Sequence, residues 1–290
     1  ATLSAKYAVK EVRDLLYRPL AEGEDAAKNK NKLDLYLPEG VHDFPVMLFI
    51  HGGAWVFGDK DQFGLYHNLA TYWARRGIGV VVANYRLSPG VKHPAHVQDV
   101  AKAFAWTKAN IANYGGDVHQ LFVSGQSAGG HLVSLLATDE SYLKAEGAKI
   151  NDIRGVLTLS GVYGLPASSA GGGLAAATGV PAGHDGGQAK RTPFSSVFGS
   201  DPKALQAAAP INHLRSGLPP FLVLYAQNDP KILRDMAVQF AAALKKTKQE
   251  VDLVEAPARN HITELVLIGQ KDDPVAAAMT QFLRQHAKLP

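Results

Sequence analysis

A serine flanked by glycines stands at residues 125–129, which read Gly-Gln-Ser-Ala-Gly and place the serine at Ser127. An apolar run at 121–123 precedes this motif, and apolar residues with helical spacing follow it from 131 to 136. Glycines two positions before and after a serine leave room for a sharp turn between a strand and a helix, which lifts the hydroxyl clear of the backbone. The pattern therefore predicts that Ser127 is a nucleophile.

A serine nucleophile needs a base, and the base needs an acid that orients it. Asp229 follows the apolar run 221–225, and His261 follows the next apolar run, 251–254. Because the carboxyl ends of parallel strands meet at one edge of a sheet, we expect these side chains to converge with Ser127. The order Ser127, Asp229, His261 predicts a hydrolytic triad with His261 as the base and Asp229 as the acid.

Each triad residue also has a simpler interpretation. Asp229 precedes Pro230, and an Asp-Pro pair is common in turns and at helix starts. His261 is one of eleven histidines, and a histidine in a loop is often solvated or structural. The position of His261, directly after the strand that follows the strand of the acid, favours it over the others. The three residues in this order favour the triad over chance.

A glycine-rich segment, residues 51–55, follows the apolar run 46–50 and reads His-Gly-Gly-Ala-Trp. Acyl transfer places negative charge on a carbonyl oxygen, and backbone N–H groups can stabilise that charge. We expect an oxyanion hole made by Gly53, Ala54 and Ala128, the last being the residue after the nucleophile. His51 is expected to hydrogen-bond the glycine loop. Trp55 is a candidate wall of the substrate pocket, with core packing as an equal alternative.

The elements that position these residues alternate along the chain. Strands are expected at 9–17, 33–37, 46–50, 79–83, 121–124, 156–160, 221–225 and 251–254. Helices are expected at 63–76, 96–112, 127–137, 232–246 and 274–286. Continuous apolar strands indicate a parallel sheet covered on both faces by helices, whereas the first two strands, with mixed or alternating patterns, indicate antiparallel edge strands. We predict one α/β domain, residues 1–290, with a mostly parallel eight-stranded sheet.

Residues 161–213 interrupt this alternation with stretches rich in glycine, alanine and serine. Long insertions of this kind in a compact domain are commonly lids or binding loops. We expect a loop-rich insertion, or lid, over the active-site end of the sheet.

Composition excludes several classes of function. The chain has 290 residues, is 46% hydrophobic and carries a formal charge of +4, and its cluster of lysines at 28–32 is interpreted as a solvated loop, so no nucleic-acid partner is expected. It has no cysteine and no run of 18 apolar residues, which argues against disulfides, thiol chemistry and a membrane span. His93 and His96 lack a third ligand nearby, so we expect no metal site and no cofactor. A cytoplasmic location and a secreted or periplasmic one are both open.

Several segments together resemble α/β-hydrolase esterases. They are residues 33–38, 51–55, 84–87, 125–132, 160–163 and 260–261. The resemblance is to the hormone-sensitive-lipase-like branch, and more closely to small bacterial carboxylesterases and feruloyl-esterase-like proteins related to kynurenine formamidase. The lipase-like branch commonly has a third glycine where this chain has Ala54 and an acidic residue where it has Gln126, which favours the feruloyl-esterase and formamidase neighbours.

The resemblance implies an α/β-hydrolase fold and a serine carboxylesterase. Such an enzyme would hydrolyse small carboxylic esters, with a short-chain acyl or a hydroxycinnamoyl (feruloyl) group, through an acyl-enzyme. An arylformamidase or amidase with the same triad is the first alternative, and a non-catalytic binding protein on a hydrolase scaffold is the second. The natural substrate and the oligomeric state stay open.

Overall fold

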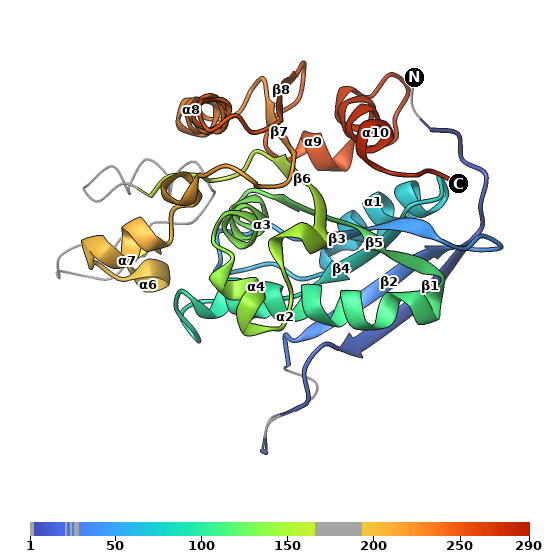
Figure 1. Cartoon of the computed structure of the whole chain (residues 1–290), viewed down its shortest axis with the longest axis horizontal. Coiled ribbons are helices and arrows are strands. Elements are labelled where there is room, and N and C mark those ends of the chain that lie inside the picture. Colours follow the sequence, from blue (N-terminus) through green and yellow to red (C-terminus); the bar gives the residue numbers. More distant parts are fainter. Residues whose placement is uncertain (1–2, 21, 24, 26–28, 166–192) are drawn as a thin grey trace.

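An eight-stranded sheet forms the centre of the computed structural model, which describes residues 3–20, 22–23, 25, 29–165 and 193–290 (Figure 1). The strand order is β1-β2-β4-β3-β5-β6-β7-β8. The pairs β1–β2 and β2–β4 are antiparallel, and all the others are parallel. All eight predicted strands are present: β1 Val9–Leu16, β2 Lys32–Pro38, β3 Phe44–Ile50, β4 Gly79–Ala83, β5 Gly116–Gln126, β6 Ile153–Leu159, β7 Phe221–Ala226 and β8 Val251–Ala256.

Strand β2 is not an edge strand, so that part of the prediction was wrong. It lies between β1 and β4, and only β1 occupies the edge. Its alternating sequence suggested one wet face, but Asp34 and Tyr36 on that face are fully buried. The polar side chains are covered because Tyr36 packs edge-on against His67 and Asp34 is paired with cations.

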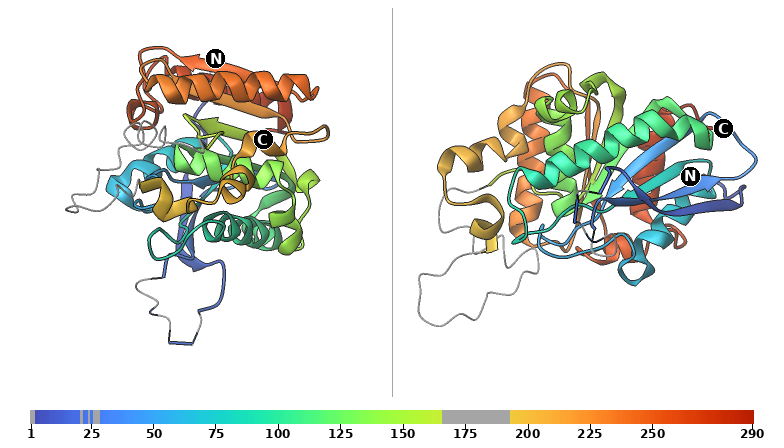
Figure 2. Two further views of the ribbon diagram at one scale, coloured as in Figure 1. Left: turned by 90° about the vertical axis from the view of Figure 1, so that its left-hand side faces the viewer. Right: turned by 90° about the horizontal axis from the view of Figure 1, so that it is seen from below.

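Helices cover both faces of the sheet, as predicted (Figures 1 and 2). Helices α2, α3 and α8 pack on one face, where Val46, Leu48 and Ile50 of β3 point, while α1 and α10 pack on the other, where Met47 and Phe49 point. This alternation along one strand produces two apolar cores from a continuous apolar run. The long helices are α1 Leu65–Ala74, α2 Ala95–Asn110, α3 Ala128–Thr138, α8 Lys231–Lys246 and α10 Pro274–His286.

Short helical segments fill the connections. They are α4 Ser141–Ala145, α6 Pro193–Phe198, α7 Pro202–Ala207 and α9 Thr263–Val266, with 3₁₀ turns at Gln62–Gly64, Ile111–Tyr114, Ile150–Asp152 and Pro210–His213. Within the part of the chain that the structure describes, none of the helices is long and apolar enough to cross a bilayer.

The insertion predicted at 161–213 is less loop-like than expected. Its second part, from residue 193, folds into α6, α7 and a 3₁₀ turn. Asp201 caps α7 by accepting the N–H of Lys203, with Pro202 at the first helical position, a signal that the small-residue composition obscured. Phe198 packs edge-on against Trp55, which joins this part of the insertion to the domain core. Residues 166–192 lie outside the described residues.

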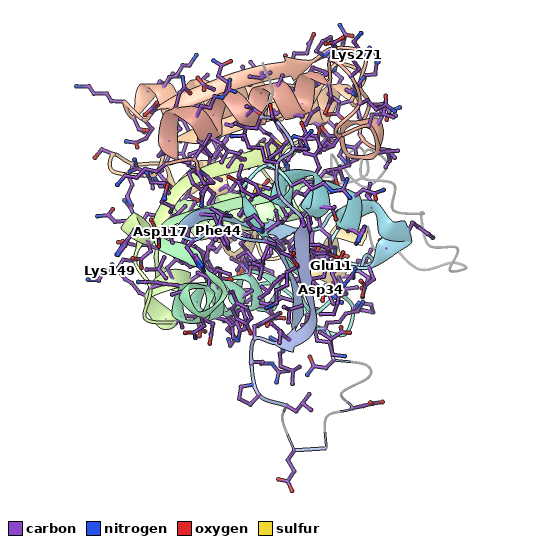
Figure 3. The ribbon with its side chains drawn as sticks, turned by 90° about the vertical axis from the view of Figure 1, so that its right-hand side faces the viewer. Glu11, Asp34, Phe44, Asp117, Lys149 and Lys271 are labelled. Carbon is purple, nitrogen blue, oxygen red and sulfur yellow. The ribbon has the colours of Figure 1, made fainter. Side chains whose placement is uncertain are left out.

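The parallel strands bring their carboxyl ends to one edge of the sheet. Ile50 pairs with Gly125, Gln126 with Leu159, and Ala226 with Ala256. The loops that follow β3, β5, β6, β7 and β8 are therefore neighbours. At the opposite end, Phe44 pairs with Gly116, and Figure 3 shows Phe44 beside Asp117 there. The order of the strands therefore brings the segments that carry the candidate site residues to one edge of the sheet.

Candidate active site

Ser127 stands on a strained turn between β5 and α3. Its backbone has φ 55° and ψ −117°, a conformation that side-chain-bearing residues rarely adopt. A Cβ at Gly129 would lie 2.0 Å from the carbonyl oxygen of Ile50, and one at Gly125 would lie 2.5 Å from the backbone of Gly129. These close approaches explain why glycine stands on both sides of the serine.

Asp229 and His261 are hydrogen-bonded to each other. The distance between His261 Nδ1 and Asp229 Oδ1 is 3.0 Å, and the Asp229 side chain is fully buried while that of His261 is 17% exposed. The Ala226 N–H donates to Asp229 Oδ2 at 3.0 Å, which anchors the carboxylate to the end of β7. Asp229 does not cap helix α8, whose first turn has no side-chain cap. Asp229 therefore lies in the turn before α8, as an Asp-Pro pair suggested, but its side chain binds His261 and does not cap the helix.

The loop that carries His261 is fixed by side-chain amides. Asn260 Oδ1 accepts the N–H groups of Ile262 and Thr263, and Thr263 Oγ1 accepts the N–H of Asn260. Gln126 Nε2, next to Ser127, donates to the carbonyl oxygen of His261 at 2.9 Å. The nucleophile turn and the histidine loop are therefore tied directly to each other.

Ser127 and His261 line one small pocket of about 110 Å³. Within the described residues, no direct hydrogen bond joins the Ser127 hydroxyl to the imidazole of His261. Contacts of this kind are often long in ligand-free enzymes and tighten when substrate binds. The remaining walls of the pocket are Gly52, Gly53, Phe57, Gln62, Leu65, Tyr66, Gln126, Ile262 and Leu265.

The glycine loop after β3 lies against the nucleophile turn. A Cβ on Gly52 would lie 2.3 Å from Gln126 Oε1 and 3.3 Å from Ser127 Cβ. Gly53 (φ 112°) lines the pocket, whereas Ala54 (φ 48°) and Ala128 are buried and do not line it. Of the three expected oxyanion donors, the structure therefore puts Gly53 in the pocket wall and the other two in the adjoining backbone.

His51 has the structural role that was predicted for it. Its Nδ1 lies 2.7 Å from the carbonyl oxygen of Gly52, and its ring stacks on Tyr85 at 4.5 Å. Burial lowers the pKa of His51 to about 4, so the ring is neutral at physiological pH and Nδ1–H donates to the loop. His51 thereby holds the shape of the glycine loop.

Trp55 belongs to the core rather than to the pocket, so its interpretation as a pocket wall was wrong. It is 1% exposed, and its indole N–H donates to His131 Nδ1 at 3.2 Å. Phe198 of the insertion covers the ring. The φ of 63° at Trp55 turns the chain inward, so that the indole packs over α3.

Sequence reasoning missed most of the pocket wall and one buried acid. Phe57, Leu65, Tyr66 and Leu265 reach the pocket from segments with no motif. Glu264 is fully buried, and burial together with the nearby charge of Asp229 raises its pKa well above the usual value for glutamate. No pattern in the sequence distinguishes this carboxyl from a surface glutamate on a short helix.

Outside the pocket, Arg86 and Asp99 form an ion pair. The guanidinium binds both carboxylate oxygens at 2.8 Å. Among the described residues, no group of three or more histidine, aspartate or glutamate side chains could hold a metal ion.

Comparison with solved structures confirms the α/β-hydrolase fold. Esterase B from Lactobacillus rhamnosis matches 96% of this chain and 85% of its own with a TM-score of 0.76 at 22% identity. A truncated carbohydrate esterase from gut microbiota matches 99% of both chains with a TM-score of 0.74 at 18% identity.

Curated relatives support the expectation of a carboxylic ester hydrolase. Esterase LipC of Mycobacterium tuberculosis (strain ATCC 25618 / H37Rv) is 30% identical over 83% of this chain, and the probable carboxylic ester hydrolase LipM of the same organism is 31% identical over 83%. The matches span only 58% and 54% of those relatives. The profile of the BD-FAE family matches residues 33–244, and the chain belongs to that family.

Proposed function

We propose that this chain is a serine carboxylesterase that hydrolyses small carboxylic esters through an acyl-enzyme on Ser127. The observation that carries the proposal is the joint position of Ser127 and His261 in one pocket, with His261 held by the buried Asp229 at 3.0 Å. The esterase relatives and the family membership support the same reaction class.

The proposed reaction has two steps. His261 Nε2 takes the proton of Ser127 as its Oγ attacks the ester carbonyl, while Asp229 accepts the hydrogen bond from Nδ1–H and stabilises the imidazolium. Backbone N–H groups of Gly53, Ala54 and Ala128 stabilise the oxyanion of the tetrahedral intermediate. The alcohol leaves, and water then repeats the sequence on the acyl-enzyme.

The pocket favours a short acyl group. Its volume of about 110 Å³ is small beside the roughly 300–1,000 Å³ of typical ligand pockets. Phe57, Leu65 and Leu265 provide apolar contacts, and none of the residues that line the pocket carries a Lys or Arg side chain that would pair with an acidic substrate. We therefore propose acetyl to butyryl esters as better substrates than octanoyl or feruloyl esters.

The direct test is the variant Ser127→Ala. We expect kcat for p-nitrophenyl acetate to fall by about 10⁴–10⁶ while the circular dichroism spectrum is retained, because the nucleophile is lost. Ser216→Ala, at an exposed serine, is the matched control and keeps full turnover. A fluorophosphonate should label the wild-type protein and the control but not Ser127→Ala. Wild-type turnover by Ser127→Ala would refute the assignment.

A substrate panel separates the alternatives. The panel contains p-nitrophenyl acetate, butyrate and octanoate, a feruloyl ester and N-formylkynurenine, and kcat/KM ranks ester hydrolysis against formamide hydrolysis. An arylformamidase would prefer N-formylkynurenine. A non-catalytic binding protein would resist fluorophosphonate labelling and turn over none of the panel.

A further inference from the structure

Two buried carboxyl groups meet on a single hydroxyl behind the proposed triad. Ser160 Oγ, directly after β6, lies 2.5 Å from Asp229 Oδ2 and 2.7 Å from Glu264 Oε2. All three side chains are fully buried. The Ala226 N–H also lies 3.4 Å from Ser160 Oγ, a long contact in which the hydroxyl is the acceptor.

The two contacts of Ser160 need one proton more than the site would hold if both acids were ionised. Each short contact between two oxygens requires one proton between them. Ser160 supplies a single hydroxyl proton for its two contacts, at 2.5 and 2.7 Å. If both carboxyls were ionised, one carboxylate oxygen would face a lone pair of Ser160 with no proton between them, inside a site without water contact. One of the two carboxyls must therefore carry a proton.

The hydrogen-bond donors assign that proton to Glu264. Asp229 receives the N–H of Ala226 on Oδ2 and the Nδ1–H of His261 on Oδ1, so each of its oxygens already accepts a hydrogen bond from a donor other than Ser160. Apart from Ser160, the carboxyl of Glu264 has one donor among the described residues, the amide of Gln126 at 3.2 Å on Oε1. Among the described residues, no Lys or Arg is paired with Glu264, and burial and the charge of Asp229 raise its pKa well above the usual range. The other titratable groups facing the cluster are His261 and Tyr163, and burial raises the pKa of the Tyr163 phenol and keeps it neutral.

We propose that Glu264 is a neutral carboxylic acid that donates its proton to Ser160 Oγ, and that Glu264 and Ser160 are positioning residues for Asp229. The assignment rests on the esterase function proposed above. In this chain of hydrogen bonds, Glu264 donates to Ser160, Ser160 donates to Asp229 Oδ2, and Asp229 Oδ1 accepts from His261. These hydrogen bonds fix the carboxylate plane of Asp229 so that Oδ1 faces the imidazole of His261.

Two further features of the site fit this role. Ser160 has φ 46°, in the left-handed region that favours glycine, so a strained backbone holds its hydroxyl between the two acids. Gln126 donates one amide group to both Glu264 Oε1 and the carbonyl of His261. Glu264 is thereby connected to the turn that carries Ser127 and to the loop that carries His261.

The protonation of Glu264 can be measured without turnover. In the protein labelled with ¹³C at the glutamate side-chain carboxyl, the resonance missing from Glu264→Gln identifies Glu264. We expect this resonance to stay at the shift of a protonated carboxyl from acid to neutral pH. A Glu264 resonance at the shift of an ionised carboxyl at neutral pH would overturn the proposal.

Kinetics test the positioning role. Gln at position 264 keeps an N–H donor toward Ser160 and an acceptor toward Gln126, so Glu264→Gln should retain kcat and the acid limb of the kcat/KM–pH profile. Glu250→Gln, at a largely exposed glutamate, is the matched control. A shifted acid limb in Glu264→Gln alone would mean that a negative charge had been removed, and the proposal would fail.

Ser160→Ala breaks the chain of hydrogen bonds in its middle. We expect kcat to fall by about ten- to a hundredfold with little change in KM, because one hydrogen bond to the charged Asp229 is lost. Unchanged kcat in folded Ser160→Ala would overturn the positioning role.

Fluorophosphonate labelling of Ser127 in the wild-type protein separates this proposal from the esterase assignment. If labelling fails, the esterase assignment and the positioning role both fall, while the ¹³C resonance still decides where the proton lies.

Discussion

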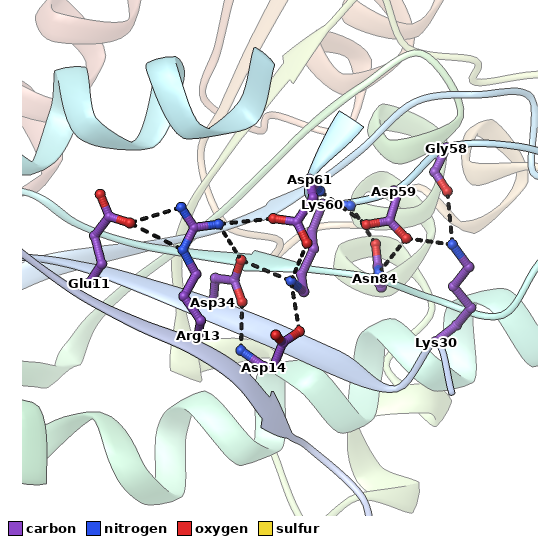
Figure 4. Close-up of polar contacts among 10 residues, drawn as sticks. All are labelled: Glu11, Arg13, Asp14, Lys30, Asp34, Gly58, Asp59, Lys60, Asp61 and Asn84. Carbon is purple, nitrogen blue, oxygen red and sulfur yellow. Dashed lines mark hydrogen bonds and ion pairs between the residues drawn. The ribbon is translucent and has the colours of Figure 1, made fainter. Parts of the chain in front are cut away.

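Two of the regions that hold buried carboxyl groups in this protein neutralise them differently. At the β1–β2 edge, Asp34 is fully buried and lies 3.0 Å from Lys60 Nζ and 3.2 Å from an Arg13 guanidinium nitrogen. Lys60 also binds Asp14 and Asp61, and Arg13 also binds Glu11, so opposite charges alternate through the network (Figure 4). Figure 3 shows Glu11 and Asp34 close together at this edge.

At the carboxyl end of β6 and β7, Asp229 and Glu264 have no Lys or Arg partner among the described residues. Their contacts are Ser160, Gln126, the Ala226 N–H and His261. A lysine beside Asp229 would compete electrostatically with the imidazolium that forms at His261 during the proposed reaction. Cations thus compensate the buried Asp34, whose role is structural. Neutral hydrogen-bond donors surround Asp229, whose proposed role is to orient His261.

The largest expected difference between the regions is in turnover. Asp229→Asn should lower kcat by about 10⁴-fold, because the amide favours the wrong imidazole tautomer. Asp34→Asn should leave kcat unchanged and lower the free energy of unfolding instead. Ester hydrolysis and urea denaturation of both variants check this, and an equal loss of kcat in both would remove the distinction.

The next largest effect is on stability at the β1–β2 edge. Burial alone would lower the pKa of Lys60, but hydrogen bonds to Asp61, Asp14 and Asp34 raise it above the usual value for lysine. Lys60→Met leaves Asp34 buried beside Arg13 alone and should cost about 3–5 kcal/mol of unfolding free energy. Lys231→Met, at a 79% exposed lysine, is the control and should change little. A small effect of Lys60→Met would show that Arg13 alone is enough to compensate the charge of Asp34.

The pH dependence of stability tests the proton on Glu264 in the region around Asp229. Glu264 binds its proton more tightly in the folded protein, so its contribution is complete below the pKa of unfolded glutamate, about 4.3, and is lost as pH rises toward the raised folded value. The wild-type protein should therefore lose stability relative to Glu264→Gln as pH rises, by up to about 1.4 kcal/mol per pH unit. Urea denaturation of both proteins from pH 5 to 8 measures this, and parallel curves would contradict it.

The smallest effect is expected at the exposed end of the network. Arg13 is 38% exposed, and its pairs with Glu11 and Asp61 are screened by solvent. Arg13→Met should change the free energy of unfolding by about 0–1 kcal/mol, and less at high salt. Denaturation at low and high ionic strength tests this, and a loss comparable to that of Lys60→Met would mean that the network acts as one unit.

Much of the fold could be predicted from the sequence, because its signals are local. Apolar runs located six strands and mixed or alternating patterns located the first two, and the glycines around Ser127 marked the turn that their close backbone contacts require. The error at β2 came from reading alternation as exposure, although Lys60 and Arg13 arrive from elsewhere to cover Asp34. The choice between pocket and core stayed open for Trp55 for a similar reason, because its partner Phe198 lies 143 residues further along the chain (198 − 55).

The sequence by itself determined the order of strands and helices, the strained turn at Ser127 and the candidate residues Asp229 and His261, since each depends on neighbouring residues. Only the tertiary structure decided which side chains line the pocket, and that Glu264 lies behind Asp229 on the hydroxyl of Ser160. Whether a carboxyl is charged depends on its burial and on the donors around it, and both are set by segments distant in the chain.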